Sequence, residues 1–242
     1  MITFNNLEKY GRFGNQLFHI ASTIGIAIRN GYDYGFLVWE EHKYFKNVLP
    51  RLLYDINKEY KLISPEGGLL TEYEDFTPPD NVSLLGHFFS EKYFLHCEKT
   101  IRHYFEMKPI EGIPKIEKNS IAIHVRAGDF GIKQFPMLTE EYYERALNHF
   151  YGRDINQVYI FSDDIKKAKE LLSPIFTYIE TDNYIHDFYL MRQCKHFIIA
   201  NSTFSWWAAW LGLDQEKTVI APKNMHGATY TDEMYPKNWI VL

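Results

Sequence analysis

The chain has 242 residues, of which 46% are hydrophobic and 24% charged, and its formal net charge is −5 at pH 7. These proportions are those of a globular protein and exclude a disordered or collagen-like chain. The length corresponds to one or two domains. Because no broad basic field is present, we expect no nucleic-acid partner, and an anionic ligand must be held by a few cations and backbone amides.

The cysteine content and the apolar stretches indicate the cellular compartment. Cys97 and Cys194 are the two cysteines, too few for a disulfide framework, which favours a reducing cytosol. The chain opens with neither a basic nor an apolar leader segment, so no secretory signal is expected. The most apolar stretch, residues 197–213, contains Ser, Thr and Asn and is too polar to span a membrane. We therefore expect a cytoplasmic protein, at most peripheral to a membrane.

The first half of the chain shows few clear elements. Apolar residues recur with a helical period over residues 14–29, and this helix opens directly after Gly11-Arg-Phe-Gly14. Residues 34–39 are predicted to form a strand, whereas residues 60–83 predict no definite element. Residues 108–115 contain two Pro and one Gly and are the best linker candidate. We therefore expect two α/β domains, residues 1–112 and 113–242.

The second half alternates between strand and helix patterns. Predicted strands cover residues 121–125, 157–161, 175–179, 196–200 and 218–221, and predicted helices cover residues 139–150, 163–172, 183–194 and 203–212. Such alternation predicts a doubly wound parallel sheet covered on both faces. Sheets of this kind bind ligands at the carboxyl ends of their strands, which indicates where the functional residues lie.

The first candidate motif is Ile121-Ala-Ile-His-Val-Arg-Ala-Gly-Asp129. Alternate residues of a strand share a face, so His124 and Arg126 emerge together at the strand's carboxyl end. An arginine fork there suits a phosphate, because it donates two parallel charge-assisted hydrogen bonds. The alternative is a structural salt bridge between Arg126 and Asp129.

A second motif, Asn201-Ser-Thr-Phe-Ser-Trp-Trp-Ala-Ala-Trp210, joins a strand to a helix. Ser202 and Thr203 stand at the amino end of that helix, where unpaired backbone N–H groups favour an anion. The alternative is that one of the two is an ordinary N-cap. The three tryptophans are more typical of a core than of a ligand platform.

Two further candidates are acidic: one pair follows a predicted strand, and a single aspartate lies near the start of a predicted helix. In Phe161-Ser-Asp-Asp164, either Ser162 or Asp163 can cap the next helix, or an acid can face the site, and spacing does not separate these readings. Asp187 heads an apolar helical stripe, which is costly for a carboxylate unless it is paired. Its two oxygens match the N1–H and N2–H edge of guanine. The alternatives are a pair with Arg192 or Lys195, or a solvated boundary position.

A fifth feature is Gly11-Arg-Phe-Gly-Asn-Gln16 in the first half. Two glycines before a helix let the backbone approach a ligand closely, with Arg12 and Asn15 pointing toward it. A Gly-x-x-Gly pair is weak evidence by itself, and a plain turn is the alternative.

Together these motifs resemble the fucosyltransferase superfamily that uses GDP-fucose, most closely the α-1,2-fucosyltransferases of glycosyltransferase family 11. Three segments carry the resemblance, namely residues 11–18, 124–129 and 194–207, and residues 161–164 and 219–223 add to it. The Asn-Ser-Thr-Phe-Ser-Trp-Trp run is highly specific to that family, whereas the His-x-Arg element is shared with α-1,6- and protein O-fucosyltransferases. Residues 40–115 contribute little to the match.

The resemblance implies a GT-B-like fold with two Rossmann-like halves facing across a cleft, the nucleotide sugar lying mainly on the second half. It implies an inverting transfer of L-fucose from GDP-L-fucose to a hydroxyl, typically O2 of a terminal β-galactoside on a glycan acceptor. No metal and no further cofactor are expected, because no clear metal-ligand spacing appears.

The resemblance also assigns roles residue by residue. Arg126 would hold the β-phosphate with His124 near the phosphates or the fucose, and Asn15 would lie at the donor–acceptor junction. The expected catalytic set is Arg126, His124, Asn15 and Asp129. The expected donor-binding set is Gly11, Arg12, Gly14, Asn15, His124, Arg126, Asp163, Asp187, Asn201, Ser202 and Thr203. The catalytic base is open between Asp129, Asp163, Asp164 and a route assisted by phosphate.

One departure from the family pattern affects the expected chemistry. The family usually has His-x-Arg-Arg-x-Asp, and Ala127 stands here in place of the second arginine; Arg12 or Lys133 are possible substitutes. The alternatives are therefore transfer of another GDP-6-deoxy sugar such as colitose, a different linkage, or a catalytically dead GDP-sugar-binding protein. A nucleotide-cofactor oxidoreductase is disfavoured, because no Gly-x-Gly-x-x-Gly opens a βαβ unit.

Overall fold

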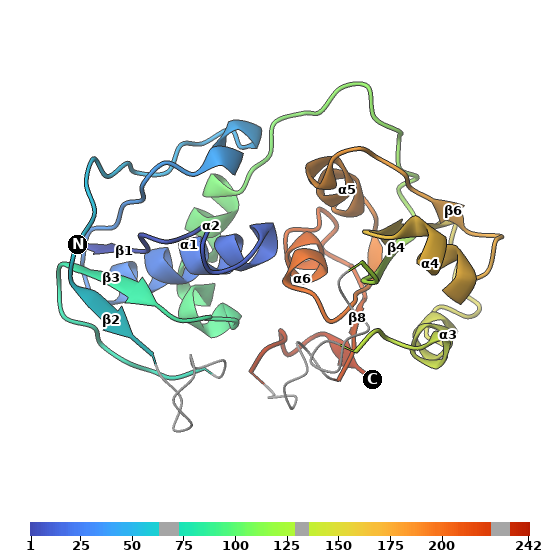
Figure 1. Cartoon of the computed structure of the whole chain (residues 1–242). Helices are drawn as coiled ribbons and strands as arrows, with labels where there is room; N and C mark the ends of the chain where they lie inside the picture. The colour runs from blue at the N-terminus through green and yellow to red at the C-terminus, as the bar shows by residue number, and fades with distance from the viewer. Residues whose placement is uncertain (63–72, 129–135, 224–232) are drawn as a thin grey trace. The chain divides into compact units, whose positions relative to one another are not determined.

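The computed structural model describes residues 1–62, 73–128, 136–223 and 233–242. The described residues fall into two compact units (Figure 1). Unit 1 lies within residues 1–109 and includes residues 233–236, and unit 2 lies within residues 110–223 and includes residues 237–242. The division after Pro109 falls inside the proline-containing segment 108–115.

Unit 1 is built on a three-stranded parallel sheet in the order β1-β3-β2. Its strands are β1 (Ile2–Thr3), β2 (Glu59–Lys61) and β3 (Val82–Leu85), and its helices are α1 (Phe13–Arg29), η1 (Glu40–Tyr44), η2 (Glu91–Tyr93), η3 (Leu95–Cys97) and α2 (Glu98–Tyr104). The predicted helix over 14–29 is confirmed as α1, most of whose residues are buried.

The predicted strand over residues 34–39 is wrong. Only two isolated bridges form there, between Ile2 and Tyr34 and between Phe36 and Arg51. Aromatic and β-branched residues favour extended backbone, but a ladder needs a partner segment that stays in register over several residues. Here the two bridges go to different partners, so the segment is extended without becoming a named strand.

Unit 2 contains a six-stranded sheet in the order β6-β5-β4-β7-β8-β9, in which every pairing is parallel. The strands are β4 (Ser120–Val125), β5 (Gln157–Ser162), β6 (Thr177–Tyr178), β7 (His196–Ile198), β8 (Val219–Ala221) and β9 (Ile240–Val241), and the helices are α3 (Glu140–Asn148), α4 (Ile165–Leu171), α5 (Tyr184–Met191) and α6 (Thr203–Trp210). The predicted alternation is confirmed; β4 and β5 are each one residue longer than predicted, the other predicted elements are shorter, and β9 was not predicted.

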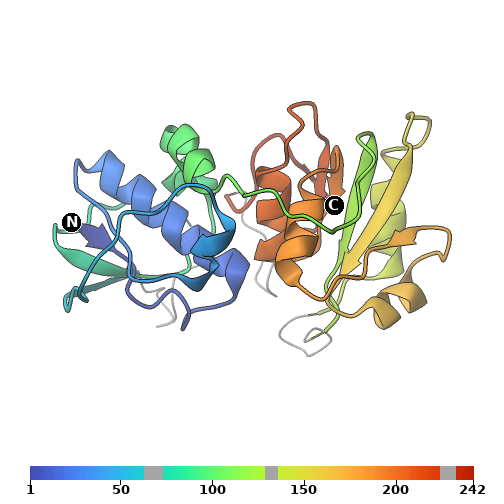
Figure 2. The ribbon, with the colours of Figure 1, turned by 90° about the horizontal axis from the view of Figure 1, so that it is seen from above.

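The strand order identifies where a ligand binds in unit 2. Numbered by position along the chain, the order is 3-2-1-4-5-6, that of a Rossmann-type sheet, and it reverses between β4 and β7. Helices α3 and α4 lie on one side of the sheet and α5 and α6 on the other (Figures 1 and 2). Ligands of such sheets bind beyond the carboxyl ends of the strands at this reversal.

The strand β4 is buried along its whole length and its side chains alternate as predicted. Ile121, Ile123 and Val125 join the core cluster that includes residues of α3 and α4. On the opposite face the ring of His124 lies 5.5 Å from that of Phe204 on α6. The alternation therefore places His124 on the α6 side of the sheet.

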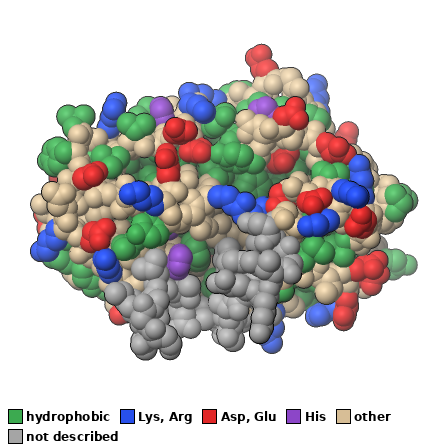
Figure 3. Space-filling view, in the orientation of Figure 1, with side chains coloured by type: hydrophobic (Ala, Val, Ile, Leu, Met, Phe, Trp, Pro, Cys, Tyr) green, Lys and Arg blue, Asp and Glu red, His purple; other side chains and the backbone are tan. Residues whose placement is uncertain are grey.

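The face of the molecule drawn in Figure 3 shows no broad basic field among the described residues. On the face drawn in Figure 3, Lys and Arg side chains are interspersed with Asp and Glu side chains. No helix within the described ranges is long and apolar enough to cross a membrane.

Candidate functional site

Three loops begin at the same edge of the unit 2 sheet. His124 pairs in register with Phe161 of β5, and Ile123 pairs with Ile198 of β7. The residues that follow β4, β5 and β7 therefore lie side by side at the carboxyl edge, around the reversal of strand order.

Arg126, directly after β4, forms an ion pair with Asp163 after β5, through Nη1 and Oδ2. The Arg126 side chain is only 10% exposed. The alternative partner, Asp129, lies outside the described residues. The ion pair therefore joins the ends of the neighbouring strands β4 and β5. From the sequence, Asp163 was expected either to cap the next helix or to face the site.

The second oxygen of Asp163 fixes the backbone of the same loop. Oδ1 of Asp163 accepts a hydrogen bond from the Ala127 amide at 2.8 Å. The Lys167 ammonium, from α4, donates to the Ala127 carbonyl at 2.9 Å. A Cβ on Gly128 would lie 2.5 Å from Oδ2 of Asp163, so a glycine is needed there. The sequence reading missed Lys167, because a lysine in a helix's first turn carries no distinctive signal.

The cap of α4 is Asp164, which corrects the expectation that Ser162 or Asp163 caps it. The Lys167 amide donates to Oδ1 of Asp164 at 3.1 Å. That hydrogen bond, with the Lys167 charge, lowers the pKa of Asp164. An acid with a lowered pKa and a capping role is poorly suited to accept a proton at neutral pH.

His124 is buried, with 4% of its surface exposed. Burial lowers its pKa to about 4, although the nearby Asp163 charge acts in the opposite direction. Its Nδ1 has no hydrogen-bond partner among the described residues. The ring is therefore neutral at pH 7 and offers a ligand a hydrogen bond rather than a charge.

The segment after β7 also presents an unpartnered polar atom. Asn201 is 1% exposed; its Nδ2 donates to the Pro136 carbonyl at 3.0 Å, and its Oδ1 has no described partner. Ser202 occupies the N-cap position of α6, but its side chain makes no capping hydrogen bond. The expectation of an ordinary Ser202 cap is therefore wrong. Thr203, the first residue of α6, is buried beside it.

The tryptophans of α6 belong to the core, as predicted. Trp206 and Trp207 are fully buried, with ring centroids 5.0 Å apart. Phe204 of α6 is half-buried, and its ring contacts that of His124.

Asp187 lies in the first turn of α5, after the carboxyl end of β6. The Thr181 hydroxyl donates to its Oδ1 at 2.7 Å, and burial raises its pKa to about 6. The alternative pairs with Arg192 or Lys195 are wrong, because Asp187 makes no ion pair within the described ranges and the Arg192 Nε donates to the Leu211 carbonyl.

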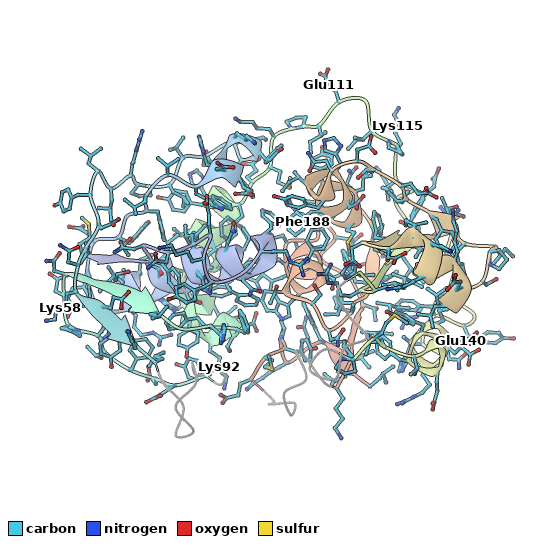
Figure 4. All side chains as sticks on the ribbon, in the orientation of Figure 1. Lys58, Lys92, Glu111, Lys115, Glu140 and Phe188 are labelled. Carbon is cyan, nitrogen blue, oxygen red and sulfur yellow. The ribbon has the colours of Figure 1, made fainter. Side chains whose placement is uncertain are left out.

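A row of aromatic contacts joins the Asp187 helix to the β4 end. The ring of Phe188, labelled on α5 in Figure 4, lies 5.4 Å from Phe204, which in turn contacts His124. Helices α5 and α6 thus pack against each other on the same side of the sheet through the buried Phe188 and the half-buried Phe204.

The residues of the Gly11–Gln16 motif lie together in unit 1, where α1 begins. Gly11 has φ +123°, and a Cβ there would lie 2.2 Å from Nδ2 of Asn15. Arg12 is exposed at the N-cap position, Gly14 is buried and Asn15 is half-buried. The positive φ and the close approach of Asn15 explain why glycine occupies position 11, and both fit the plain turn as well as a ligand loop.

No group of three His, Cys, Asp or Glu side chains in the part of the chain that the structure describes is arranged to hold a metal ion. The polar groups at the carboxyl edge of unit 2 are instead the Arg126 guanidinium with its partner Asp163, the His124 imidazole, the Asn201 amide and the Ser202 and Thr203 hydroxyls. This set suits an anionic ligand with hydrogen-bonding groups.

Comparison with known proteins gives a family match over nearly the whole chain and relatives that cover parts of it. The family model described as Glycosyl transferase family 11 matches residues 2–242. An alpha-1,2-colitosyltransferase of Escherichia coli is 32% identical over 161 residues, which are 59% of this chain and 55% of that protein. The O-antigen biosynthesis glycosyltransferase WbnK of Escherichia coli is 33% identical over 135 residues, 51% of this chain and 45% of that protein.

A human relative and one solved structure extend the comparison. Human galactoside alpha-(1,2)-fucosyltransferase 1 is 25% identical over 234 residues, 83% of this chain and 63% of that protein. The chain thus spans about half to two thirds of these relatives. The crystal structure of fucosyltransferase NodZ from Bradyrhizobium matches with a TM-score of 0.51 at 15% identity, covering 82% of this chain and 90% of that one. This likeness confirms the predicted α/β, GT-B-like fold class.

The contacts of Asp163 with Arg126 and with the Ala127 amide can be tested with Gly128→Ala. The new methyl group displaces the Asp163 carboxylate, and we expect unfolding free energy to fall by about 1–3 kcal/mol through lost charge-assisted hydrogen bonds. Urea denaturation of four proteins, wild type, Gly128→Ala, Asp163→Ala and the double variant, measures the coupling. In the Asp163→Ala background, Gly128→Ala should lower the free energy of unfolding by less than about 0.5 kcal/mol. An equal cost in both backgrounds contradicts this account of the glycine.

Proposed function

This chain belongs to glycosyl transferase family 11, and from that premise we propose that it transfers L-fucose from GDP-L-fucose to O2 of a terminal β-galactoside. The proposed reaction inverts the anomeric configuration and uses no metal. Two kinds of support bear on it: the names of its relatives, which include an alpha-1,2-fucosyltransferase, and the polar groups gathered at the carboxyl edge of unit 2.

The single observation that carries the proposal is the position of Arg126. Its guanidinium is held by Asp163 at the end of β4, where the strand order reverses. Breaking the bond between fucose C1 and phosphate leaves the electron pair on the pyrophosphate oxygen. A fixed guanidinium near that oxygen stabilises the developing negative charge without needing to reorganise.

The amino end of α6 supports the same role. Its first-turn amides and the Ser202 and Thr203 hydroxyls are donors, and the helix dipole favours an anion there. The unpartnered Oδ1 of Asn201 and Nδ1 of His124 are both buried at this edge. Buried polar atoms of this kind normally have a partner, which ordered water or a ligand can supply.

Asp187 is proposed to recognise guanine. An ionised carboxylate accepts from both N1–H and N2–H of that base, and adenine lacks this pair of donors. The Thr181 hydroxyl orients the carboxylate through Oδ1. The buried Phe188 packs against Phe204, which in turn contacts His124, so this helix is held against the end of β4.

A second donor sugar is favoured by a specific observation. The 32% identity to an alpha-1,2-colitosyltransferase makes GDP-colitose the alternative donor. Colitose is L-fucose without its 3-hydroxyl group. A site that hydrogen-bonds the 3-hydroxyl would reject colitose strongly, whereas a site that packs apolar groups there discriminates far less.

The proposed function is tested by incubating the protein with lactose and either GDP-fucose or GDP-colitose, with and without EDTA. We expect an α-1,2-linked trisaccharide, identified by NMR, in equal amount in both EDTA arms. The donor that gives the higher kcat/KM identifies the sugar. An absolute metal requirement contradicts the metal-independent mechanism, and GDP binding without turnover on any acceptor supports a catalytically dead binding protein.

Arg126→Ala should lower kcat at least about a hundredfold, because loss of one preorganised donor to a developing anion costs about 3 kcal/mol. Steady-state kinetics with the preferred donor measures the effect, and far-UV circular dichroism checks that the fold survives. The matched control is Arg145→Ala, an exposed arginine of α3. Activity of Arg126→Ala within threefold of wild type would remove this residue from the mechanism.

The raised pKa of Asp187 predicts a pH-dependent preference for guanine. Below about pH 6 the carboxyl is protonated and loses part of its acceptor capacity, so the ratio of GDP to ADP affinity should rise from pH 5 to pH 7. Isothermal titration at each pH measures the ratio, in which phosphate ionisation common to both nucleotides cancels. Asp187→Asn should give a low ratio that does not change with pH. An unchanged wild-type ratio contradicts the guanine role.

A further inference from the structure

Ala127, the residue that follows Arg126, is held at each of its groups. Its side chain is fully buried in the core cluster that also contains Val125. Its amide donates to Oδ1 of Asp163 at 2.8 Å, and its carbonyl accepts from the Lys167 ammonium at 2.9 Å. The two peptide groups that flank this alanine therefore have fixed partners, which come from the end of β5 and from the first turn of α4.

These contacts determine the direction in which the Arg126 side chain leaves the backbone. A peptide group is planar, so a chain changes direction only through the φ and ψ angles between neighbouring groups. Asp163 holds the peptide group directly after Arg126, and Lys167 holds the next one. Because Val125 and Ala127 lie in the same core cluster, the alternation of β4 continues beyond its end and places Arg126 on the opposite face.

Lys167 is itself oriented by the cap of α4. Its amide donates to Oδ1 of Asp164 at 3.1 Å, and its ammonium lies 3.5 Å from Oδ2 of the same carboxylate. The ammonium therefore has two oxygen partners, the cap and the Ala127 carbonyl. Because the lysine side chain is 44% exposed, its ion pair with Asp164 contributes little to stability. The bond to the carbonyl is the contact by which this lysine acts on the site.

The position of α4 places Lys167 away from the groups proposed to bind the pyrophosphate. Helix α4 lies on the opposite side of the sheet from α6 (Figures 1 and 2). Ser202 and Thr203 stand at the amino end of α6, and the His124 ring contacts α6 through Phe204. Lys167 therefore reaches the loop from the other side, which favours a supporting contact over direct binding of the donor.

The absence of the second arginine makes the position of the first one important. With Ala127 in its place, the proposed stabilisation at the end of β4 depends on the guanidinium of Arg126. A preorganised donor is effective only while it is directed at the atom on which charge develops. A displacement of about 1 Å can lower a rate about a hundredfold. A residue that holds this loop can therefore change the rate without touching the donor.

We propose that Lys167 is a positioning residue of the transfer reaction, which holds the Ala127 carbonyl and thereby directs the Arg126 guanidinium toward the departing pyrophosphate. This inference rests on the proposed function. Asp164 orients the lysine, the lysine and Asp163 hold the two peptide groups after Arg126, and the arginine stabilises the charge. The lysine neither contacts the donor nor exchanges a proton with it.

The first test is Lys167→Met, which removes the ammonium and keeps an unbranched side chain with a high helix propensity. We expect kcat with lactose and the preferred donor to fall about 10- to 100-fold. The matched control is Lys169→Met on the same helix, whose ammonium pairs with Glu180; it makes the same change of charge and should keep kcat within about twofold of wild type. Lys167→Arg can still donate to the carbonyl and should restore kcat to within about threefold. Urea denaturation checks that each variant is folded.

A double-mutant cycle separates positioning from direct contact with the donor. In the Arg126→Ala background, Lys167→Met should lower kcat by less than about twofold, because the lysine acts through the arginine. The affinity for GDP, measured by titration calorimetry, gives a second cycle, in which Lys167→Met should weaken binding only while Arg126 is present. An equal loss in both backgrounds shows that the lysine binds the donor itself and overturns the proposal.

The two cycles distinguish failure of this inference from failure of the proposed function. An active wild type whose Lys167→Met variant keeps kcat within threefold refutes the positioning role alone. A wild type that binds GDP but transfers no sugar refutes the proposed function, and the GDP cycle then decides the role of the lysine: coupled losses support positioning, and additive losses refute it. A wild type that does not bind GDP contradicts both.

Discussion

The ion pair between Arg126 and Asp163 is the interaction on which the unit 2 site depends. A guanidinium that is only 10% exposed is costly without a partner, because a desolvated charge needs both an opposite charge and hydrogen bonds. Asp163 supplies the charge from the next strand end and uses its other oxygen on the Ala127 amide. The same carboxylate therefore stabilises the cation and the loop that carries it, and Gly128 leaves the space that this double role needs.

Much of unit 2 was predictable from the sequence, whereas little of unit 1 was. In unit 2, strands and helices follow one another locally, so periodicity alone reveals their order, and only the two-residue β9 escaped. In unit 1 the strands have two to four residues, and β1 pairs with β3 across some eighty residues of chain. Pairing of such short segments is decided by long-range packing, which also explains why residues 34–39 form bridges rather than a strand.

Side-chain positions that follow from alternation along one strand could be predicted. Partners that depend on how two strands align with each other could not. Alternation places His124 toward α6, as expected. The partner of Arg126 depends on how β4 aligns with β5, which no local pattern reveals. Asp164 rather than its neighbours caps α4 because of the backbone angles at that turn, which are equally invisible in sequence.

The substitution of alanine for the second arginine of the family pattern has a physical consequence. Ala127 is fully buried in the core cluster, so its side chain fills packing space rather than a ligand site. Among the described residues around this loop, the positive charges of Arg126 and Lys167 are matched by the negative charges of Asp163 and Asp164. A pyrophosphate bound there adds net negative charge, and the guanidinium acts within a neutral pair. In the proposed reaction the dipole and donors at the amino end of α6 would supply further stabilisation, so the proposal assigns the two features to one site.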